Sequence, residues 1–211
     1  MTLIKSISGI RGTIGGTPGE GLSPMDIVKF TYAYCAKLKE RRPKPEAERY
    51  RIVVGKDARL SGDMVEQLVC GTAVACGVDV IKAGFASTPT TEMAVIFEEA
   101  DGGIILTASH NPKQWNALKL LNGKGEFLND AEGKRVLALA EDEAFVFPEI
   151  DAIGKVVSRE DFNSTHIQQV LALDLVDVEA VKARKFKVVV DAVNSIGGVV
   201  IPQLLKELGC E

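Results

Sequence analysis

Short apolar runs alternate along the chain with longer segments whose apolar positions recur every three to four residues. The short runs are typical of buried strands, and the longer period is typical of helices packed on a sheet. The pattern predicts strands at residues 3–7, 51–55, 78–82, 103–106 and 117–121. It predicts helices from Ser23, with Pro24 in the first turn, to about Arg42, and at about residues 61–76, 88–99 and 129–143. This alternation predicts an α/β fold with a mixed, mostly parallel sheet sandwiched by helices.

A break in the pattern follows at residues 147–157. Residues 159–184 are helix-rich, residues 186–190 are predicted to form a strand, and another helix is predicted to begin near Gly197. One strand and one helix cannot make a sheet by themselves. We therefore expect a first domain over residues 1–150. Over residues 151–211 we expect a linker helix and the truncated start of a second α/β domain, so that the sequence is a fragment.

The composition indicates a globular protein with one well-buried core. The chain has 211 residues, of which 46% are hydrophobic, with a net charge of −4, two histidines and four cysteines. It lacks the roughly 18-residue apolar run that crosses a membrane, and its N-terminus lacks the apolar core of a secretion signal. The acidic balance argues against nucleic acid, and the few histidines argue against zinc but not against a hard cation held by oxygen ligands. We expect a cytoplasmic protein with reduced cysteines.

The sequence TASHNP (residues 107–112) directly follows a predicted strand. Ligands of open α/β sheets bind beyond the carboxyl ends of the strands, which is where this loop is expected. Small and turn-forming neighbours favour a tight turn that projects the hydroxyl of Ser109. Alone, the loop would also suit a helix start capped by Ser109 or Asn111. A hydrolase triad is disfavoured because His110 adjoins the serine and the sequence has no G-x-S-x-G elbow.

Two cationic residues stand in unusual sequence settings. Lys119 interrupts the apolar run ALKLL, and a buried ammonium is costly unless it reaches solvent or an anion. An edge strand with Lys119 facing water would also explain the pattern. Arg11 lies between glycines in SISGIRGTIGG, where backbone amides can approach a ligand and the guanidinium matches phosphate geometry.

Two other turns are expected to be structural. In GKDARLSG (residues 55–62), an ion pair between Asp57 and Arg59 would stabilise the turn, with Ser61 as a helix cap. Structural roles are also predicted for the remaining candidates: Thr88 as a helix cap with Pro89 after it, Trp115 packing over the loop, and His166.

Together these motifs resemble the α-D-phosphohexomutase family, which comprises phosphoglucomutase, phosphomannomutase and phosphoglucosamine mutase. The matching stretches, in family order, are SGIRG (8–12), GKDARLSG (55–62), STP (87–89), TASHNP (107–112), Asn116 with Lys119, and VVVDAVN (188–194). The resemblance covers essentially the whole chain. It departs at Ala117, where the family has glycine, and at NSIG (194–197), where the family has N-G-x-G, but neither change removes a reactive group.

The resemblance implies that Ser109 carries a phosphoryl group. Ser109 would give this group to a hydroxyl of a hexose 1- or 6-phosphate and recover the other phosphate from a bisphosphate intermediate. Mg²⁺ on the phosphoserine, together with Arg11 and Lys119, would offset the charge, and Lys119 could also move a proton. His110 would hold the phosphate or the loop. Asn111, Asp57 and Arg59 would bind the phosphate or the substrate, or support the residues that do.

The resemblance also implies a four-domain enzyme. Its aspartate-rich metal loop, sugar-recognition loop and C-terminal phosphate-binding loop are not in this sequence, so the chain alone is expected to be inactive and to need the remaining domains. The expected partner is a phosphosugar substrate, and the short SGIRG start without an upstream tyrosine is closer to the phosphoglucosamine mutase branch. The alternative is a non-catalytic anion-binding α/β module in which Ser109 only caps, and a serine hydrolase ranks third.

Overall fold

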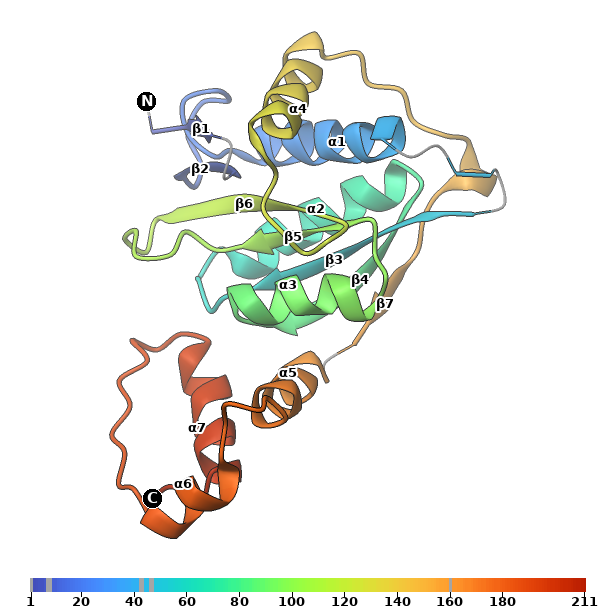
Figure 1. The fold of residues 1–211 in the computed structure, drawn as a ribbon. Coiled ribbons are helices and arrows are strands. Elements are labelled where there is room, and N and C mark those ends of the chain that lie inside the picture. Colours follow the sequence, from blue (N-terminus) through green and yellow to red (C-terminus); the bar gives the residue numbers. More distant parts are fainter. Residues whose placement is uncertain (1, 7–8, 42–43, 46–47, 160) are drawn as a thin grey trace.

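In a computed structural model, the described residues (2–6, 9–41, 44–45, 48–159 and 161–211) contain a single seven-stranded mixed sheet (Figure 1). The strands lie in the order β1 (Ile4–Ser6), β2 (Gly9–Thr13), β6 (Trp115–Asn122), β5 (Gly102–Leu106), β3 (Tyr50–Lys56), β4 (Val78–Phe85) and β7 (Val156–Ser158). Pairing is parallel from β5 through β3 and β4 to β7 and antiparallel elsewhere. The mixed α/β sheet is confirmed, although parallel pairs make up half of the six described pairings.

Helices cover both faces of the sheet (Figure 1). On one face lie α1 (Pro24–Arg41), α2 (Gly62–Ala75) and α4 (Asp130–Asp142), and on the other lie α3 (Thr88–Phe97) and α5 (Phe162–Leu171). Strand β5 shows how the sequence allows this arrangement. Its Ile104 and Leu106 pack in one core cluster and Ile105 packs in the other, so every residue of the strand is buried. A strand buried on both faces needs a continuous apolar run, and that run made β5 predictable.

Most predicted element boundaries hold to within a few residues, but the cap of α3 was assigned to the wrong residue. The Oγ of Ser23 accepts the N–H of Asp26 at 3.3 Å at the start of α1, as expected. At α3 the cap is Ser87 rather than Thr88, because the Oγ of Ser87 accepts the N–H of Thr90 at 3.2 Å. Three predicted positions, at residues 7, 8 and 42, lie outside the described residues.

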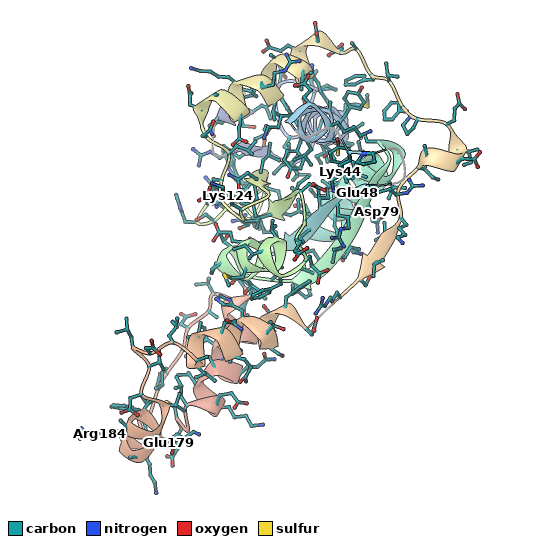
Figure 2. All side chains as sticks on the ribbon, turned by 45° about the vertical axis from the view of Figure 1, so that its right-hand side comes forward. Lys44, Glu48, Asp79, Lys124, Glu179 and Arg184 are labelled. Carbon is teal, nitrogen blue, oxygen red and sulfur yellow. The ribbon has the colours of Figure 1, made fainter. Side chains whose placement is uncertain are left out.

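The C-terminal part of the chain extends away from the sheet. The helices α6 (Val178–Arg184) and α7 (Gly197–Glu207) lie there, and Figure 2 shows Glu179 and Arg184 of α6 far from the sheet. The predicted strand at residues 186–190 is wrong, since this segment is not paired as a strand and Val189 is 99% exposed. Its backbone bonds run to the chain end, where Val188 donates to Glu211 O at 2.7 Å. An apolar run becomes a strand only beside a partner strand, and none lies next to it among the described residues.

Two elements near the predicted domain boundary at residue 150 were not predicted from the sequence. The short 3₁₀ helix η1 (Ile150–Ala152) leads to β7, which pairs with β4 and extends the sheet beyond that boundary. Among the described residues, every helix is too short or too polar to traverse a lipid bilayer. The four cysteines are free thiols, three of them buried, as expected.

His166 connects α5 to α3 and is expected to make stability depend on pH. Its Nδ1 lies 3.0 Å from Thr90 Oγ1, and burial lowers the pKa of His166. The folded chain therefore binds fewer protons here than the unfolded chain, so the free energy of unfolding falls as the pH drops through about 6.5 towards the lowered pKa. Urea denaturation at about pH 7.5 and about pH 5 should show this loss. The His166→Gln variant should lose less of its free energy of unfolding between these pH values than the wild type. An equal loss in both proteins would mean that other groups cause the pH dependence.

Candidate active site

The TASHNP loop joins β5 to β6 and presents Ser109 to solvent. Ser109 has a left-handed backbone with a φ of 53°, and its exposed Oγ lies 3.5 Å from His110 Nδ1. A non-glycine residue rarely adopts this conformation, which costs on the order of 1–3 kcal/mol and persists where the surroundings enforce it. The predicted tight turn is therefore present. Because a strand and not a helix follows, Ser109 does not act as a helix cap.

Arg59 fastens this loop to the body of the domain. It lies in the turn between β3 and α2, and its guanidinium donates to four carbonyl oxygens of the loop. The acceptors are Ser109 at 2.8 Å, Asn111 at 2.9 Å, Pro112 at 3.0 Å and Trp115 at 2.9 Å. The sequence pattern predicted that Arg59 stabilises its own turn. Its larger role spans some 50 positions of sequence, which no local pattern can show.

Asp57 completes the network beneath the loop. Its buried carboxylate accepts Thr107 Oγ1 at 2.6 Å and the backbone N–H of Arg59 at 3.1 Å, and it lies 3.3 Å from Arg59 Nε. The expected ion pair between Asp57 and Arg59 is therefore present. Thr107 Oγ1 in turn accepts the N–H of Ser109 at 3.1 Å. Thr107 was not singled out as a site residue, although its place at the end of a strand beside the serine was a signal.

Ser61 has a different role from the one predicted. It stands at the start of α2, but its side chain makes no capping bond. Instead its Oγ accepts Asn116 Nδ2 at 2.9 Å, and Asn116 is fully buried at the start of β6. The bond joins the Arg59 turn to the strand that leaves the serine loop. Ser61 therefore supports the site, and the capping prediction was wrong.

Arg11 and Lys119 lie on neighbouring strands and on the same face of the sheet. Arg11 is paired with Ala117, and Lys119 follows two positions further along β6, where alternate side chains share a face. Arg11 is exposed, whereas Lys119 is half-buried with its Nζ 5.7 Å from the ring centre of Phe127. The edge-strand explanation of Lys119 is wrong, because β6 lies between β2 and β5.

The charge of Lys119 faces Glu92 on α3. Burial raises the pKa of Glu92, and the nearby ammonium of Lys119 opposes that rise. Within the described residues, neither Arg11 nor Lys119 bonds to Ser109, whose hydroxyl lies near His110. The structure thus brings both cations to one face of adjoining strands, and β6 is the strand that follows the Ser109 loop.

The described residues do not by themselves form a magnesium site. They contain no group of three or more histidine, cysteine, aspartate or glutamate side chains placed to hold a metal ion. Asp57 is already occupied by Thr107 and Arg59. Ser109 would offer a metal ion a phosphoryl oxygen only if it carried a phosphoryl group.

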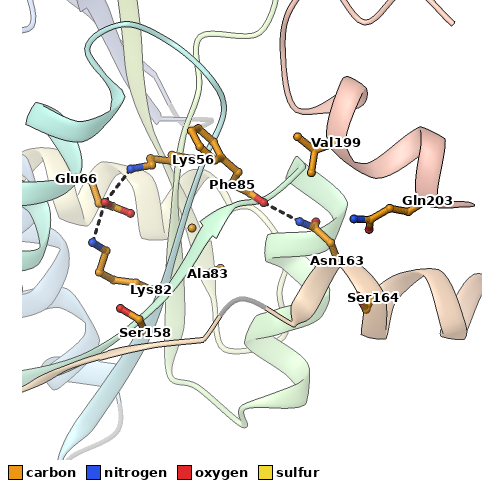
Figure 3. Close-up of a pocket in the computed structure, with 11 residues that line it drawn as sticks. Lys56, Glu66, Lys82, Ala83, Phe85, Ser158, Asn163, Ser164, Val199 and Gln203 are labelled. Atoms are coloured by element: carbon orange, nitrogen blue, oxygen red, sulfur yellow. Dashed lines mark hydrogen bonds and ion pairs between the residues drawn. The ribbon is translucent and has the colours of Figure 1, made fainter.

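A separate polar pocket of about 370 Å³ lies where β4 and β7 meet α5 and α7 (Figure 3). Glu66 is 3% exposed, and its Oε2 accepts the ammonium groups of Lys56 and Lys82, each at 2.9 Å. Asn163 closes the other side of the pocket by donating to Phe85 O at 2.7 Å. Asp63 also pairs with Lys56 at 2.5 Å, so two carboxylates offset the two ammonium groups and the pocket is not a simple anion site.

Known proteins similar to this chain identify its family. Residues 3–147 match the family model described as phosphoglucomutase/phosphomannomutase, alpha/beta/alpha domain I. A phosphoglucomutase/phosphomannomutase of Thermococcus kodakarensis is 37% identical over 202 residues, which are 95% of this chain and 43% of that protein. A phosphoglucosamine/phosphogalactosamine mutase of Sulfurisphaera tokodaii is 35% identical over 212 residues, which are 100% of this chain and 44% of that protein.

A similar fold occurs in the crystal structure of a phosphoglucomutase/phosphomannomutase family protein from Burkholderia thailandensis. The TM-score is 0.71 at 23% sequence identity, over 99% of this chain and 43% of that one. The chain thus spans less than half the length of the relatives it matches. Since the family model covers most of the sequence, from residue 3 to residue 147, the chain belongs to the phosphoglucomutase/phosphomannomutase family.

Proposed function

We propose that this chain is part of a phosphohexomutase that interconverts hexose 1-phosphates and 6-phosphates through a phosphoserine at Ser109 and a bisphosphate intermediate. The observation that carries the proposal is the exposed, left-handed Ser109 on a loop fixed by Arg59. Relatives of similar sequence are named as phosphoglucomutase/phosphomannomutase and as phosphoglucosamine/phosphogalactosamine mutase. Phosphoryl transfer depends mainly on in-line positioning and charge neutralisation, and a serine fixed on a turn can supply the positioning.

Each half of the reaction exchanges one P–O bond for another. A sugar hydroxyl attacks the phosphorus on Ser109, the bond from phosphorus to Oγ breaks, and the proton of the attacking hydroxyl ends on Oγ, with Lys119 as its proposed carrier. After the bisphosphate reorients, Oγ attacks its other phosphate and the proton returns to the sugar. We assign Arg11 and Lys119 to the phosphoryl charge, Lys119 also to the proton, and His110 and Asn111 to holding the phosphate or the loop.

The remaining parts of the site are expected outside these residues. Mg²⁺ on the phosphoserine would need ligands from elsewhere in the protein, so the steps assigned to this chain do not run through it. We propose that the chain alone is inactive and that the other domains select the sugar, with glucosamine phosphate as the favoured substrate. The cytoplasmic location stays a prediction.

Phosphopeptide mapping and isomerase assays test the proposal. The whole protein, purified from cells, should carry phosphate at Ser109. It should isomerise at least one of glucose 1-phosphate, mannose 1-phosphate and glucosamine 1-phosphate. Absence of both the phosphate and every isomerase activity would overturn the assignment.

Lys119→Met should separate charge from packing. Methionine retains a flexible apolar stem at this half-buried position but removes the ammonium, so we expect kcat to fall by about 10²- to 10⁴-fold with little change in melting temperature. Lys124→Met, in an exposed turn, is the matched control and should leave kcat unchanged. A Lys119→Met enzyme within a few-fold of wild type would remove Lys119 from the mechanism.

A further inference from the structure

The hydroxyl of Thr107 is occupied both as a donor and as an acceptor. Its Oγ1 donates to Asp57 Oδ2 at 2.6 Å, because a carboxylate can only accept a hydrogen bond. The single hydroxyl proton is therefore used, and the lone pairs of Oγ1 accept the N–H of Ser109 at 3.1 Å. Thr107 and Asp57 are each only 8% exposed. The N–H of Ser109 is in this way tied to the interior of the domain.

The carbonyl side of Ser109 is held from the turn that contains Asp57. Arg59 Nη2 donates to Ser109 O at 2.8 Å. The backbone N–H of Arg59 in turn donates to Asp57 Oδ1 at 3.1 Å. Arg59 Nε has no hydrogen-bond partner among the described residues and lies 3.3 Å from Asp57 Oδ2 as an ion pair. Both backbone groups of the serine are therefore held by side chains that have Asp57 as their common partner.

These contacts enforce an unfavourable backbone conformation. The N–H of Asn111 donates to Ala108 O at 3.0 Å, which makes Ser109, with its φ of 53°, the first central residue of a turn. A positive φ at this position is usually taken by glycine, asparagine or aspartate. A serine keeps such a conformation only where its surroundings impose it, and strain of this kind gathers at functional sites. Among the described residues, Thr107 is the partner that imposes it on the N–H side.

Resting on the proposed function, we infer that Thr107 is a positioning residue for phosphoryl transfer. Anchored on Asp57, its hydroxyl keeps Ser109 left-handed, so that the exposed Oγ is presented to the phosphosugar in one orientation. Thr107 is buried and acts through the serine, not on the substrate, so kcat should depend on it and KM should not. A misplacement of about 1 Å at a reacting group can cost on the order of 100-fold in rate.

Comparing Thr107→Val with Thr107→Ser in the whole protein tests the inference. Valine keeps the β-branched shape of threonine without the hydroxyl, whereas serine keeps the hydroxyl. Per phosphorylated enzyme, counted by intact mass, Thr107→Val should lower kcat on the order of 10- to 100-fold with little change in KM. It should also shift the ³¹P resonance of the phosphoserine, while Thr107→Ser should stay close to wild type in kcat, KM and ³¹P resonance. Thr165→Val removes a hydroxyl that donates to Asp161 O at the start of α5, and this matched control should change none of them.

A merely structural role for Thr107 makes a different prediction. Thr107→Val would then melt at a lower temperature, but its kcat per phosphorylated enzyme and its ³¹P resonance would match those of Thr107→Ser, which would overturn the inference. If Thr107→Val fails to fold, hydrogen exchange of the wild type decides. The Ser109 amide should be protected relative to the amide of exposed Lys113, and equally fast exchange would overturn the inference.

The same measurements separate this inference from the proposed function. Wild-type protein with no phosphate at Ser109 and no isomerase activity would reject the proposed function itself. An active, phosphorylated wild type with equal Thr107 variants would reject this inference alone.

Discussion

Ser109→Ala is expected to abolish isomerase activity in the whole protein, with a fall in kcat of at least about 10⁴-fold, as for other enzymes that lose their nucleophile. The mutation removes the oxygen that would form and break the bond to phosphorus. It should leave the fold intact, because this Oγ is exposed and lies within 3.5 Å of His110 only as a weak contact. Intact mass should show the loss of one phosphoryl group, and a coupled assay should show the loss of turnover.

Ser109→Gly is the sharper companion variant. Glycine adopts a φ of 53° without strain, so this variant should be as stable as wild type or up to about 1 kcal/mol more stable, while being equally inactive. Stability and activity then move in different directions, which a structural role for the hydroxyl does not allow. Ser164→Ala removes an exposed hydroxyl from α5 and should change neither property. Retained turnover in Ser109→Ala would place the phosphoryl shuttle elsewhere.

The parts of the fold that were predictable from sequence are those in which local pattern and burial agree. Strands β3 and β5 are apolar because both their faces are covered, and the serine loop lies at the end of such a strand. By contrast, β7 has three exposed residues and is a strand only because β4 lies beside it. The segment at residues 186–190 is the reverse case. Its apolar composition suits a strand, but among the described residues no partner strand pairs with it, so it is not a strand.

The residues of the candidate site likewise fall into those that local sequence could indicate and those that depend on distant contacts. Ser109, Arg11 and Lys119 were found because each is an unusual residue in its own local setting. The supporting contacts could not be found, because Arg59 and Asp57 reach partners some 50 positions away, and Ser61 bonds Asn116 across 55 positions. A side chain near a helix start has several acceptors and donors within reach, and only the tertiary structure decides among them.

Glu66→Ala is expected to lower the free energy of unfolding by about 3–5 kcal/mol, which is a large share of the stability of a typical domain. Glu66 is the carboxylate on which Lys56 and Lys82 converge (Figure 3). Burial lowers the pKa of Lys56, but its bonds to Asp63 and Glu66 outweigh this and hold the pKa above its ordinary value. Without Glu66, two ammonium groups face each other, and among the described residues Lys56 keeps the exposed Asp63 as its ion-pair partner beside the ring of Phe85.

Replacing the charges together should cost less than removing one of them. The Oε1 of Glu66 is buried and has no hydrogen-bond partner among the described residues, so the native triad already carries a desolvation cost. The double variant Glu66→Leu with Lys82→Met removes that cost along with one opposing cation, and should recover most of the stability lost in Glu66→Ala. Lys134→Ala breaks the exposed pair with Asp130 and should change the free energy of unfolding by less than about 1 kcal/mol. Urea denaturation of the wild type and the three variants measures these changes in the free energy of unfolding. If Glu66→Ala lowers it no more than Lys134→Ala does, water in the pocket screens the triad and burial of Glu66 does not affect stability.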